Sequence, residues 1–424
     1  GGKGSWPIAG TAVYMTSYPR SEEGREWEDI LPVRKWLYQT PEQILIKASN
    51  GASDFGNKFG QPLICGSVLT FEHQENNEKY AYDKVIMLAG GVGYGTQRDC
   101  LKGAPETGNK VVVLGGGTGS STLLRGLKEF PVDLTSIVSV CDDGSSTGVL
   151  REEFGIPAVG DIRRVLVALS ETEPLVMELF NYRFHTKSDL DGHTVGNLLL
   201  TASSEITGNL SDGIEALSKV FNLKGKVVPL TEDNVVLMGE MEDGCIIEGE
   251  HNITANKSQI KRVFYKEEPV PTKEAVKAIE DAELIILSMG SLFTSIIPNL
   301  ICDEIRHAID RSQGKVMYVC NMVTQPGETE KFTVSDHVKL LNQYLGEHKV
   351  DVVIANSGKI DDSMARRYES LEQKDPVVLD MKETEKLVKK VVCGDYVTIK
   401  NNLLRHNVMK LGLDIFGYLL EQKA

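Results

Sequence analysis

A glycine-rich segment at residues 115–120 is the first place where this sequence could hold a ligand. It directly follows four branched apolar residues, 111–114, which are typical of a strand buried on both faces. Glycine permits positive φ and a close approach of the backbone to a ligand. Leucines and Phe130 then recur at helical spacing. The glycines therefore precede a helix, whose N-terminus favours an anion such as phosphate.

The segment differs from two known phosphate-binding motifs. No Gly-Lys-Ser/Thr follows it, so it is not a P-loop. Ser120 also stands where the third glycine of the dinucleotide motif G-x-G-x-x-G would lie. Alone, the segment is weak evidence for a ligand site, because a structural tight turn is the ordinary explanation for such glycines.

The same arrangement recurs after four further apolar stretches, and this repetition favours a ligand site. Each stretch is a predicted strand that ends in small, polar residues. In an open α/β sheet the carboxyl ends of parallel strands line the ligand crevice, so these ends should converge on one site. The four stretches are residues 135–141, 284–287, 316–320 and 350–355, followed by polar residues 142–146, 288–295, 321–325 and 356–358.

The fold class predicted from this pattern is α/β. We expect a three-layer, Rossmann-like nucleotide-binding domain at residues 110–424, preceded by a partial α+β fragment at residues 1–109. Residues 226–253 alternate apolar and polar, with turn signals at 232–234 and 242–244. We interpret them as a small β-hairpin insertion that forms a lid or an edge of the domain.

Composition limits the possible functions. The net charge of −14 over 424 residues argues against non-specific binding of nucleic acid, which needs a basic face. The seven cysteines are scattered without a C-x-x-C pair, which favours free thiols in a reducing cytosol. We find no signal peptide and no apolar run near the ~18 residues of a membrane span. We expect a soluble, cytoplasmic protein that does not insert into membranes.

Asp142 and Asp143 follow the second predicted strand, and two functions are open for them. One of them could bond a ribose hydroxyl, as an acidic residue does at this place in dinucleotide-binding folds. As neighbours on a turn they could instead hold Mg²⁺, which prefers carboxylate and phosphate oxygens. The structural alternative is a turn of the Asx type, which is common at Asp-Gly.

Several further polar residues have both a structural and a functional interpretation. Asp161, after Gly160 and before a helical pattern, is first of all an expected helix N-cap. Arg163 and Arg164 could clamp phosphate or point to solvent. His193 is more often structural than catalytic when no Ser/His/Asp pattern or metal spacing accompanies it. Asn197 would bond backbone or ligand at the start of the next helix.

The first 109 residues resemble part of phosphoribosylformylglycinamidine synthase, the glutamine-dependent amidating enzyme of purine synthesis. The resemblance lies in residues 4–14, 51–62, 66–73 and 82–95. It covers a small internal piece of a large enzyme, without the glutaminase part and most of the ATP-binding part. We expect this fragment to be non-functional.

Residues 110–424 resemble the YvcK-type gluconeogenesis-factor family, a branch of the CofD-like proteins. The resemblance lies in the glycine segment and in residues 141–151, 160–163, 193–199, 290–300 and 321–329. Near the C-terminus, Tyr368 and Arg405-His406 match the positions with which the family binds uridine-nucleotide sugars. A tyrosine can stack on the base and an arginine can pair with the diphosphate.

The resemblance implies a UDP-sugar-binding protein linked to carbon metabolism and cell-shape control. The expected ligand is a UDP-sugar such as UDP-N-acetylglucosamine, with Mg²⁺ as a second candidate and homodimer formation left open. Whether the chain is an enzyme is also open. The alternatives are a Mg²⁺-dependent phospholactate or nucleotidyl transferase of the CofD branch and, from the N-terminal fragment, a purine-biosynthesis amidating enzyme.

The predicted ligand-binding residues come from the ends of the predicted strands, from the segments around Arg163 and His193, and from the resemblance. Asp142 is also the candidate metal ligand, and no catalytic residue is assigned. The set is Gly115, Gly116, Gly117, Thr118, Gly119, Ser120, Asp142, Asp143, Ser145, Ser146, Asp161, Arg163, His193, Asn197, Gly290, Ser291, Thr294, Ser295, Asn321, Thr324, Gln325, Asn356, Tyr368 and Arg405.

Overall fold

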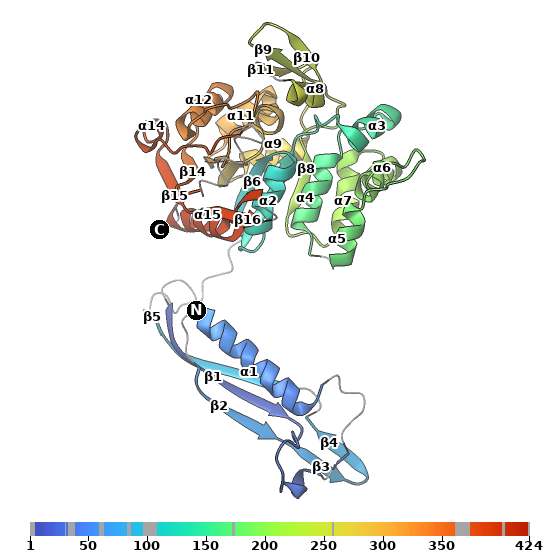
Figure 1. Cartoon of the computed structure of the whole chain (residues 1–424), viewed down its shortest axis with the longest axis vertical. Helices are drawn as coiled ribbons and strands as arrows, with labels where there is room; N and C mark the ends of the chain where they lie inside the picture. The colour runs from blue at the N-terminus through green and yellow to red at the C-terminus, as the bar shows by residue number, and fades with distance from the viewer. Residues whose placement is uncertain are drawn as a thin grey trace. The chain divides into compact units, whose positions relative to one another are not determined.

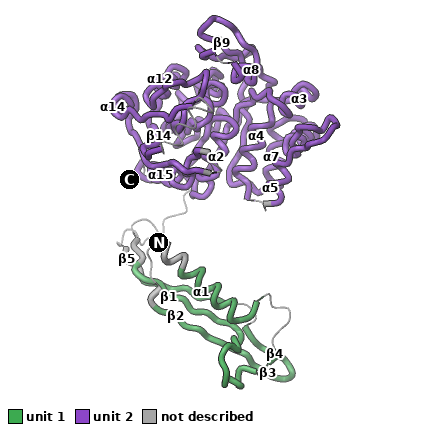
Figure 2. The backbone as a smooth tube through the Cα atoms, viewed as in Figure 1, with its two compact units in different colours: residues 1–106 green, residues 107–424 purple. Residues whose placement is uncertain are grey.

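The structure is a computed structural model, and it divides the chain into two compact units. These are Gly1–Glu106 and Thr107–Ala424 (Figure 2). Each unit is considered by itself. The residues described are 5–29, 31–32, 39–58, 63–82, 86–95, 108–171, 174–256, 258–360, 374–400 and 403–422.

The first unit contains a three-stranded sheet and one long helix. The central strand β1 (Ser5–Thr16) pairs in parallel with β2 (Leu63–Thr70) and antiparallel with β5 (Ile86–Gly95). The helix α1 (Pro41–Lys58) begins at the proline, where the missing N–H costs nothing. A short 3-10 helix, η1 (Glu26–Glu28), and a hairpin of β3 (Glu72–Glu75) and β4 (Glu78–Ala81) complete the described part.

The second unit is built on a seven-stranded sheet in which every strand pair is parallel (Figure 1). All four side chains of β12 are buried, which requires cover on both faces of the sheet. The expected α/β fold with a large parallel sheet is confirmed. The sheet order is β15 (Lys390–Gly394), β14 (Val352–Asn356), β13 (Lys315–Val319), β12 (Leu284–Leu287), β6 (Asn109–Gly115), β7 (Val132–Val138) and β8 (Lys226–Pro229).

The strand order reverses between β6 and β12. From β6 the chain adds β7 and β8 on one side, and it then returns to add β12, β13, β14 and β15 on the other side. Such a switch point leaves a crevice beyond the carboxyl ends of the two strands, and ligands bind there in open α/β sheets. The five predicted strands correspond to β14, β13, β12, β6 and β7, which are consecutive neighbours in the sheet and include the switch point.

Helices connect the strands. The glycine segment leads into α2, which contacts α4 and the C-terminal helix α15. None of the helices in the described part is long and apolar enough to cross a membrane. In the described part of this unit the helices, apart from one introduced below, are α2 (Gly117–Leu127), α3 (Ser145–Phe154), α4 (Gly160–Leu169), α5 (Pro174–Asn181), α6 (Val195–Thr207), α7 (Leu210–Val220), α9 (Lys273–Glu280), the π-helix η2 (Leu292–Ile296), α10 (Ile297–Leu300), α11 (Asp303–Arg311), α12 (Val334–Tyr344), α14 (Met381–Thr384) and α15 (Val408–Gln422).

The predicted insertion at residues 226–253 is only partly a hairpin. Its first part is β8, the edge strand of the large sheet, because the apolar Val227 and Val228 pair with β7. The hairpin is β9 (Leu237–Met241) with β10 (Ile246–Glu248), and β11 (Ile260–Tyr265) joins it as a third strand. The helix α8 (Glu250–Ala255) lies between β10 and β11 in the chain. We call β9, β10, α8 and β11 the small sheet. A further hairpin, β16 (Val397–Lys400) with β17 (Leu403–His406), precedes α15.

Candidate functional site

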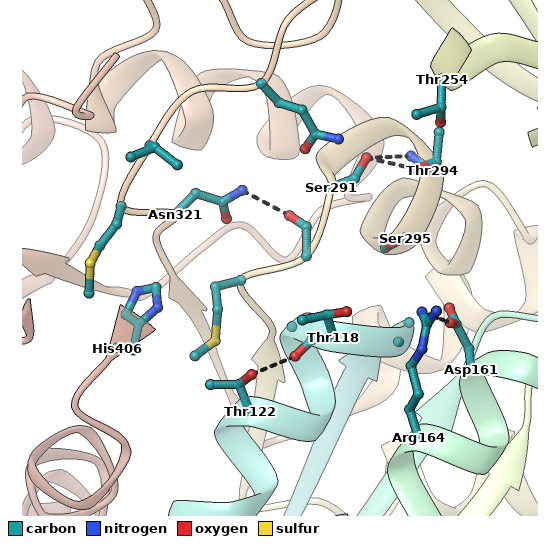
Figure 3. Close-up of a pocket in the computed structure, with 18 of the residues that line it drawn as sticks. Thr118, Thr122, Asp161, Arg164, Thr254, Ser291, Thr294, Ser295, Asn321 and His406 are labelled. Atoms are coloured by element: carbon teal, nitrogen blue, oxygen red, sulfur yellow. Dashed lines mark hydrogen bonds and ion pairs between the residues drawn. The ribbon is translucent and has the colours of Figure 1, made fainter. Parts of the chain in front are cut away.

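A cavity of about 560 Å³ opens beside the switch point of the large sheet. Its walls come from the loops after β6, β7, β12 and β13, from α4, from α8 of the small sheet and from β17 (Figure 3). The lining residues are Gly116, Gly117, Thr118, Gly119, Thr122, Ser139, Asp142, Asp161, Arg164, Glu250, Thr254, Met289, Gly290, Ser291, Thr294, Ser295, Asn321, Met322, Val323, Thr324, Gln325, Lys374, Leu404, Arg405 and His406.

The glycine segment forms the floor of this cavity, and close packing explains two of its glycines. A Cβ on Gly119 would lie 2.5 Å from the Gly290 backbone nitrogen, so the loops after β6 and β12 touch there. A Cβ on Gly116 would lie 2.5 Å from Oδ2 of Asp161. Both glycines are therefore needed to bring other parts of the site against the N-terminus of α2.

Asp161 lines the cavity, as predicted, but it does not cap its helix. It lies in the first turn of α4, but the N-cap of that helix is Val159, so the predicted N-cap role of Asp161 is wrong. Its carboxylate accepts a hydrogen bond from the backbone of Gly117 and pairs with Nη1 of Arg164 at 3.0 Å. Burial raises the pKa of Asp161 to about 6, despite the nearby Arg164. A carboxylate of the protein thus already faces the N-terminus of α2.

The loop after β12 forms a second wall around the π-helix η2. Ser291 caps this helix by accepting from the Thr294 N–H at 3.1 Å, and its own hydroxyl donates to the Glu328 carboxylate at 2.5 Å. Burial raises the pKa of Glu328 to about 7. Asn321 donates to the Gly290 carbonyl at 3.0 Å. Glu328 and Asn321 therefore fix the loop that presents Thr294 and Ser295 to the cavity.

A third wall comes from β17 and the loop after β13. Arg405 lines the cavity and donates from Nη1 to the Leu404 carbonyl at 3.1 Å. His406 lies next to it, with Nε2 3.3 Å from the Cys320 carbonyl. Burial lowers the pKa of His406 to about 4, so this ring is neutral at pH 7. Met322 and Leu404 add apolar surface to the same wall.

Glu250 and Thr254 reach the cavity from the small sheet, and sequence reasoning missed both. They lie one turn apart on α8. Burial, and then the charge of Asp142, raise the pKa of Glu250 to about 7. No sequence signal marks Glu250, because the residue stands outside every motif and only the tertiary fold brings α8 to the switch point.

Of the predicted residues, fourteen lie in the cavity wall. Most come from the loops after β6, β12 and β13, as expected for the carboxyl ends of the strands. Their role in binding stays a prediction. The fourteen are Gly116, Gly117, Thr118, Gly119, Asp142, Asp161, Gly290, Ser291, Thr294, Ser295, Asn321, Thr324, Gln325 and Arg405.

Four other predicted residues form a buried hydrogen-bond network away from the cavity lining. Nδ1 of His193 lies 3.0 Å from the Ser146 hydroxyl, which accepts from Nδ2 of Asn197 at 3.1 Å. Nε of Arg163 donates to Oδ1 of Asn197 at 2.9 Å, and its Nη1 donates to Asn181. Arg163 is thus buried in this network and does not point to solvent, and its role in binding stays a prediction. The network joins α3, α4 and α6 through Ser146, Arg163 and Asn197.

The remaining predicted residues also lie outside the cavity lining. Gly115 and Ser120 are buried behind the glycine loop, where Ser120 bonds Ser288 at 3.0 Å. Asp143 accepts from the His251 N–H at 2.7 Å and so anchors α8. Ser145 begins α3, and Asn356 bonds the turn to Gly358. Tyr368 lies outside the described residues.

Asp142 combines the turn and the cavity interpretations. Its Oδ1 accepts from the Gly144 N–H at 3.0 Å, which is the Asx-type turn, and the residue also lines the cavity. Among the described residues, no group of three His, Cys, Asp or Glu side chains could hold a metal ion. Mg²⁺ usually takes only one or two protein carboxylates together with ligand phosphates, so Asp142 as a metal ligand stays a prediction.

Comparison with known proteins gives a consistent result. The family described as 2-phospho-L-lactate transferase CofD matches residues 111–397. The gluconeogenesis factor of Bacillus subtilis is 46% identical over 300 residues, 70% of this chain and 94% of that protein. The gluconeogenesis factor of Listeria innocua is 40% identical over 290 residues, 68% of this chain and 89% of that protein.

Solved structures agree with the sequence relatives. A crystal structure of a protein from Bacillus halodurans is 43% identical, with a TM-score of 0.71. It covers 73% of this chain and 99% of its own. A second crystal structure from that organism, described as a member of the UPF0052 family, has a TM-score of 0.70 at 43% identity and covers 72% of this chain and 99% of its own.

Proposed function

From the premise that the chain belongs to the CofD family, with gluconeogenesis factors as its relatives, we propose that the cavity binds a UDP-sugar such as UDP-N-acetylglucosamine. The observation that carries the proposal is the cavity itself. It lies at the switch point, between the glycine loop of α2 and Arg405 of β17. Its volume of about 560 Å³ suits a small organic ligand.

The chemistry of the walls supports this class of ligand. The backbone of the glycine loop and the guanidinium of Arg405 are donors suited to a diphosphate. Met322, Val323 and Leu404 supply apolar surface for a flat base. Hydroxyl, amide and carboxylate groups around Thr294, Asn321 and Glu250 suit a sugar rich in hydroxyls.

We further propose that the protein is a regulatory binder linked to carbon metabolism and cell shape, and that it works in the cytoplasm. A transferase that activates an acceptor needs a base, and His406 suits that role poorly, because burial lowers its pKa to about 4 and its Nε2 lies against the Cys320 carbonyl. The six cysteines of the described part are all free thiols, which suits a reducing compartment.

A Mg²⁺-dependent transferase is the second candidate, because the matching family is described as a 2-phospho-L-lactate transferase and because Asp142 faces the cavity. The two candidates differ in the fate of the ligand. Incubation with UDP-N-acetylglucosamine and Mg²⁺, followed by anion-exchange chromatography, should return the ligand unchanged while calorimetry records binding. A new product would favour the transferase, and an absence of binding would refute the proposal.

A further inference from the structure

We propose that Glu250 selects the sugar part of the bound nucleotide sugar, and that the small sheet serves to carry this residue to the cavity. The inference rests on the proposed function and assigns one residue within that site. It also gives the ligand a direction in the cavity, with the sugar at the end formed by α8 and the base at the end formed by β17.

The position of α8 is fixed from both sides. The Asp143 carboxylate accepts from the His251 N–H at 2.7 Å and so ties the first turn of α8 to the loop after β7. The Glu250 carboxyl group hydrogen-bonds the side chain of Thr294 in η2. Glu250 thus bridges the small sheet and the loop after β12, and Thr254 extends the same wall by one turn of α8.

The two ends of the cavity differ in charge. Figure 3 shows Asp161, Arg164, Thr254 and Thr294 on one side, and Asn321 and His406 on the other, with Thr118 of the glycine loop between them. Asp142 and Glu250 add carboxylates to the first end. Arg405 adds a cation next to His406 at the second end.

This difference decides the orientation of the ligand. Above neutral pH these three carboxylates repel a diphosphate, and the one arginine beside Asp161 offsets only part of their charge. Hydroxyl groups, in contrast, donate hydrogen bonds to carboxylates, and such charge-assisted bonds are stronger than neutral ones. The sugar is the part of the ligand that is rich in hydroxyls, so it belongs at the end with Glu250.

Burial and the neighbouring Asp142 raise the pKa of Glu250 to about 7. Near neutral pH the residue is therefore both a hydrogen-bond acceptor and, when protonated, a donor. This suits a sugar that carries hydroxyl donors and an acetamido carbonyl. The apolar Met322 and Leu404 at the opposite end leave that end to the base.

The test compares UDP with UDP-N-acetylglucosamine by calorimetry at pH 8, using the full chain and the variants Glu250→Ala and Glu250→Gln. Both variants should weaken binding of the nucleotide sugar by about five- to tenfold and should not weaken binding of UDP. Glu248→Ala is the matched control. Glu248 lies two residues earlier in the small sheet, where it pairs with Lys266 at 3.2 Å and does not line this cavity. It should change neither affinity.

Each other result overturns the inference in a recognisable way. An equal loss for UDP and the nucleotide sugar would mean that Glu250 acts on the nucleotide or on the shape of the cavity. Unchanged affinities in both Glu250 variants would also refute it, and the proposed function would stand. If the unaltered protein bound neither ligand, the proposed function itself would fall, and the inference with it.

Discussion

The carboxylate of Asp161 faces the glycine loop, and this leads to a prediction that runs against the usual effect of mutating a binding site. Asp161→Asn should tighten binding of a UDP-sugar above neutral pH. The amide keeps an oxygen that can accept from Gly117, but it removes a negative charge from the place where a diphosphate would approach. Arg164, which pairs with Asp161 in the unaltered protein, would also become available to the ligand.

The magnitude follows from the distance and the screening. Two unit charges about 6 Å apart interact by roughly 3 kcal/mol at an effective dielectric constant of about 20. Arg164, at 3.0 Å from Asp161, cancels much of that repulsion, which leaves on the order of 1 kcal/mol. We therefore expect an increase in affinity of roughly fivefold at pH 8.

The dependence on pH identifies the cause. The pKa of Asp161 is raised to about 6, so the residue is charged at pH 8 and mostly neutral at pH 5. The affinity ratio between variant and unaltered protein should be large at pH 8 and approach one at pH 5. Glu250 is present in both proteins, but the charge of Asp161 contributes to its raised pKa, so the contribution of Glu250 cancels only in part in the ratio. Both phosphates of the nucleotide sugar are esterified and do not titrate in this range.

The assay is calorimetry with UDP-N-acetylglucosamine in EDTA, at pH 5 and pH 8. Asp281→Asn is the control, because this exposed carboxylate pairs with Lys110 near the start of β12, away from the strand ends that form the cavity. A ratio that does not change with pH would refute the electrostatic reasoning. Weaker binding of the Asp161 variant at pH 8 would do so as well, and would mean that Asp161 holds the ligand.

Four further predictions test other parts of the structure. Arg405→Ala should weaken the free energy of UDP-sugar binding by about 1.5–3 kcal/mol, because a charge-assisted hydrogen bond is lost, and should leave the melting temperature unchanged. Unchanged affinity in calorimetry would show that Arg405 does not contribute to the site. Asp142→Asn should reduce any Mg²⁺ dependence of binding, and equal titrations with and without Mg²⁺ would favour the turn or ribose interpretation. Deleting residues 1–106 should raise solubility in sedimentation assays and preserve UDP-sugar affinity, because that unit exposes apolar side chains: Val68, Leu88 and Val92 are 56%, 54% and 64% exposed. If the shortened chain failed to fold, the first unit would be an integral part of the folded protein. Although burial opposes it, hydrogen bonds from His348 and Lys389 hold the pKa of Asp351 well below its usual range. The stability that this gives is fully present above about pH 4 and should be lost as the pH falls from that value to the lower pKa of the folded state, and Asp351→Asn should reduce this dependence in urea unfolding.

The sheet was predictable because its strands are marked locally. Residues 284–287 are apolar throughout and coincide with β12, and the predicted strands at 316–320 and 350–355 differ from β13 and β14 by one or two residues. A strand buried on both faces needs such a run, whatever the rest of the chain does. The edge strand β8 was assigned to the hairpin, because its four residues join an alternating pattern that continues into β9.

The contacts of individual side chains were less predictable than the strands, because two residues of the same type can have different partners in the fold. Arg163 and Arg164 are neighbours in the sequence, yet consecutive positions on α4 point in different directions. Arg163 is buried against Asn197, whereas Arg164 reaches the cavity and pairs with Asp161. A pattern of residue types cannot say which of two adjacent arginines faces the sheet crevice until the packing of α4 is known.

The charges of the cavity show even more clearly that a sequence pattern cannot place side chains that only tertiary packing brings together. The glycine loop predicts an anion at the N-terminus of α2, and that expectation rests on backbone geometry alone. Asp161 comes from α4 and Glu250 from α8, and only the packing of these helices against α2 and η2 brings two carboxylates to the cavity. Their raised pKa values have the same origin, since burial is their largest cause. The electrostatic potential at the binding site is therefore set by residues outside the glycine motif. For this reason the pH dependence of binding tests the packing of these helices more directly than a mutation in the glycine motif would.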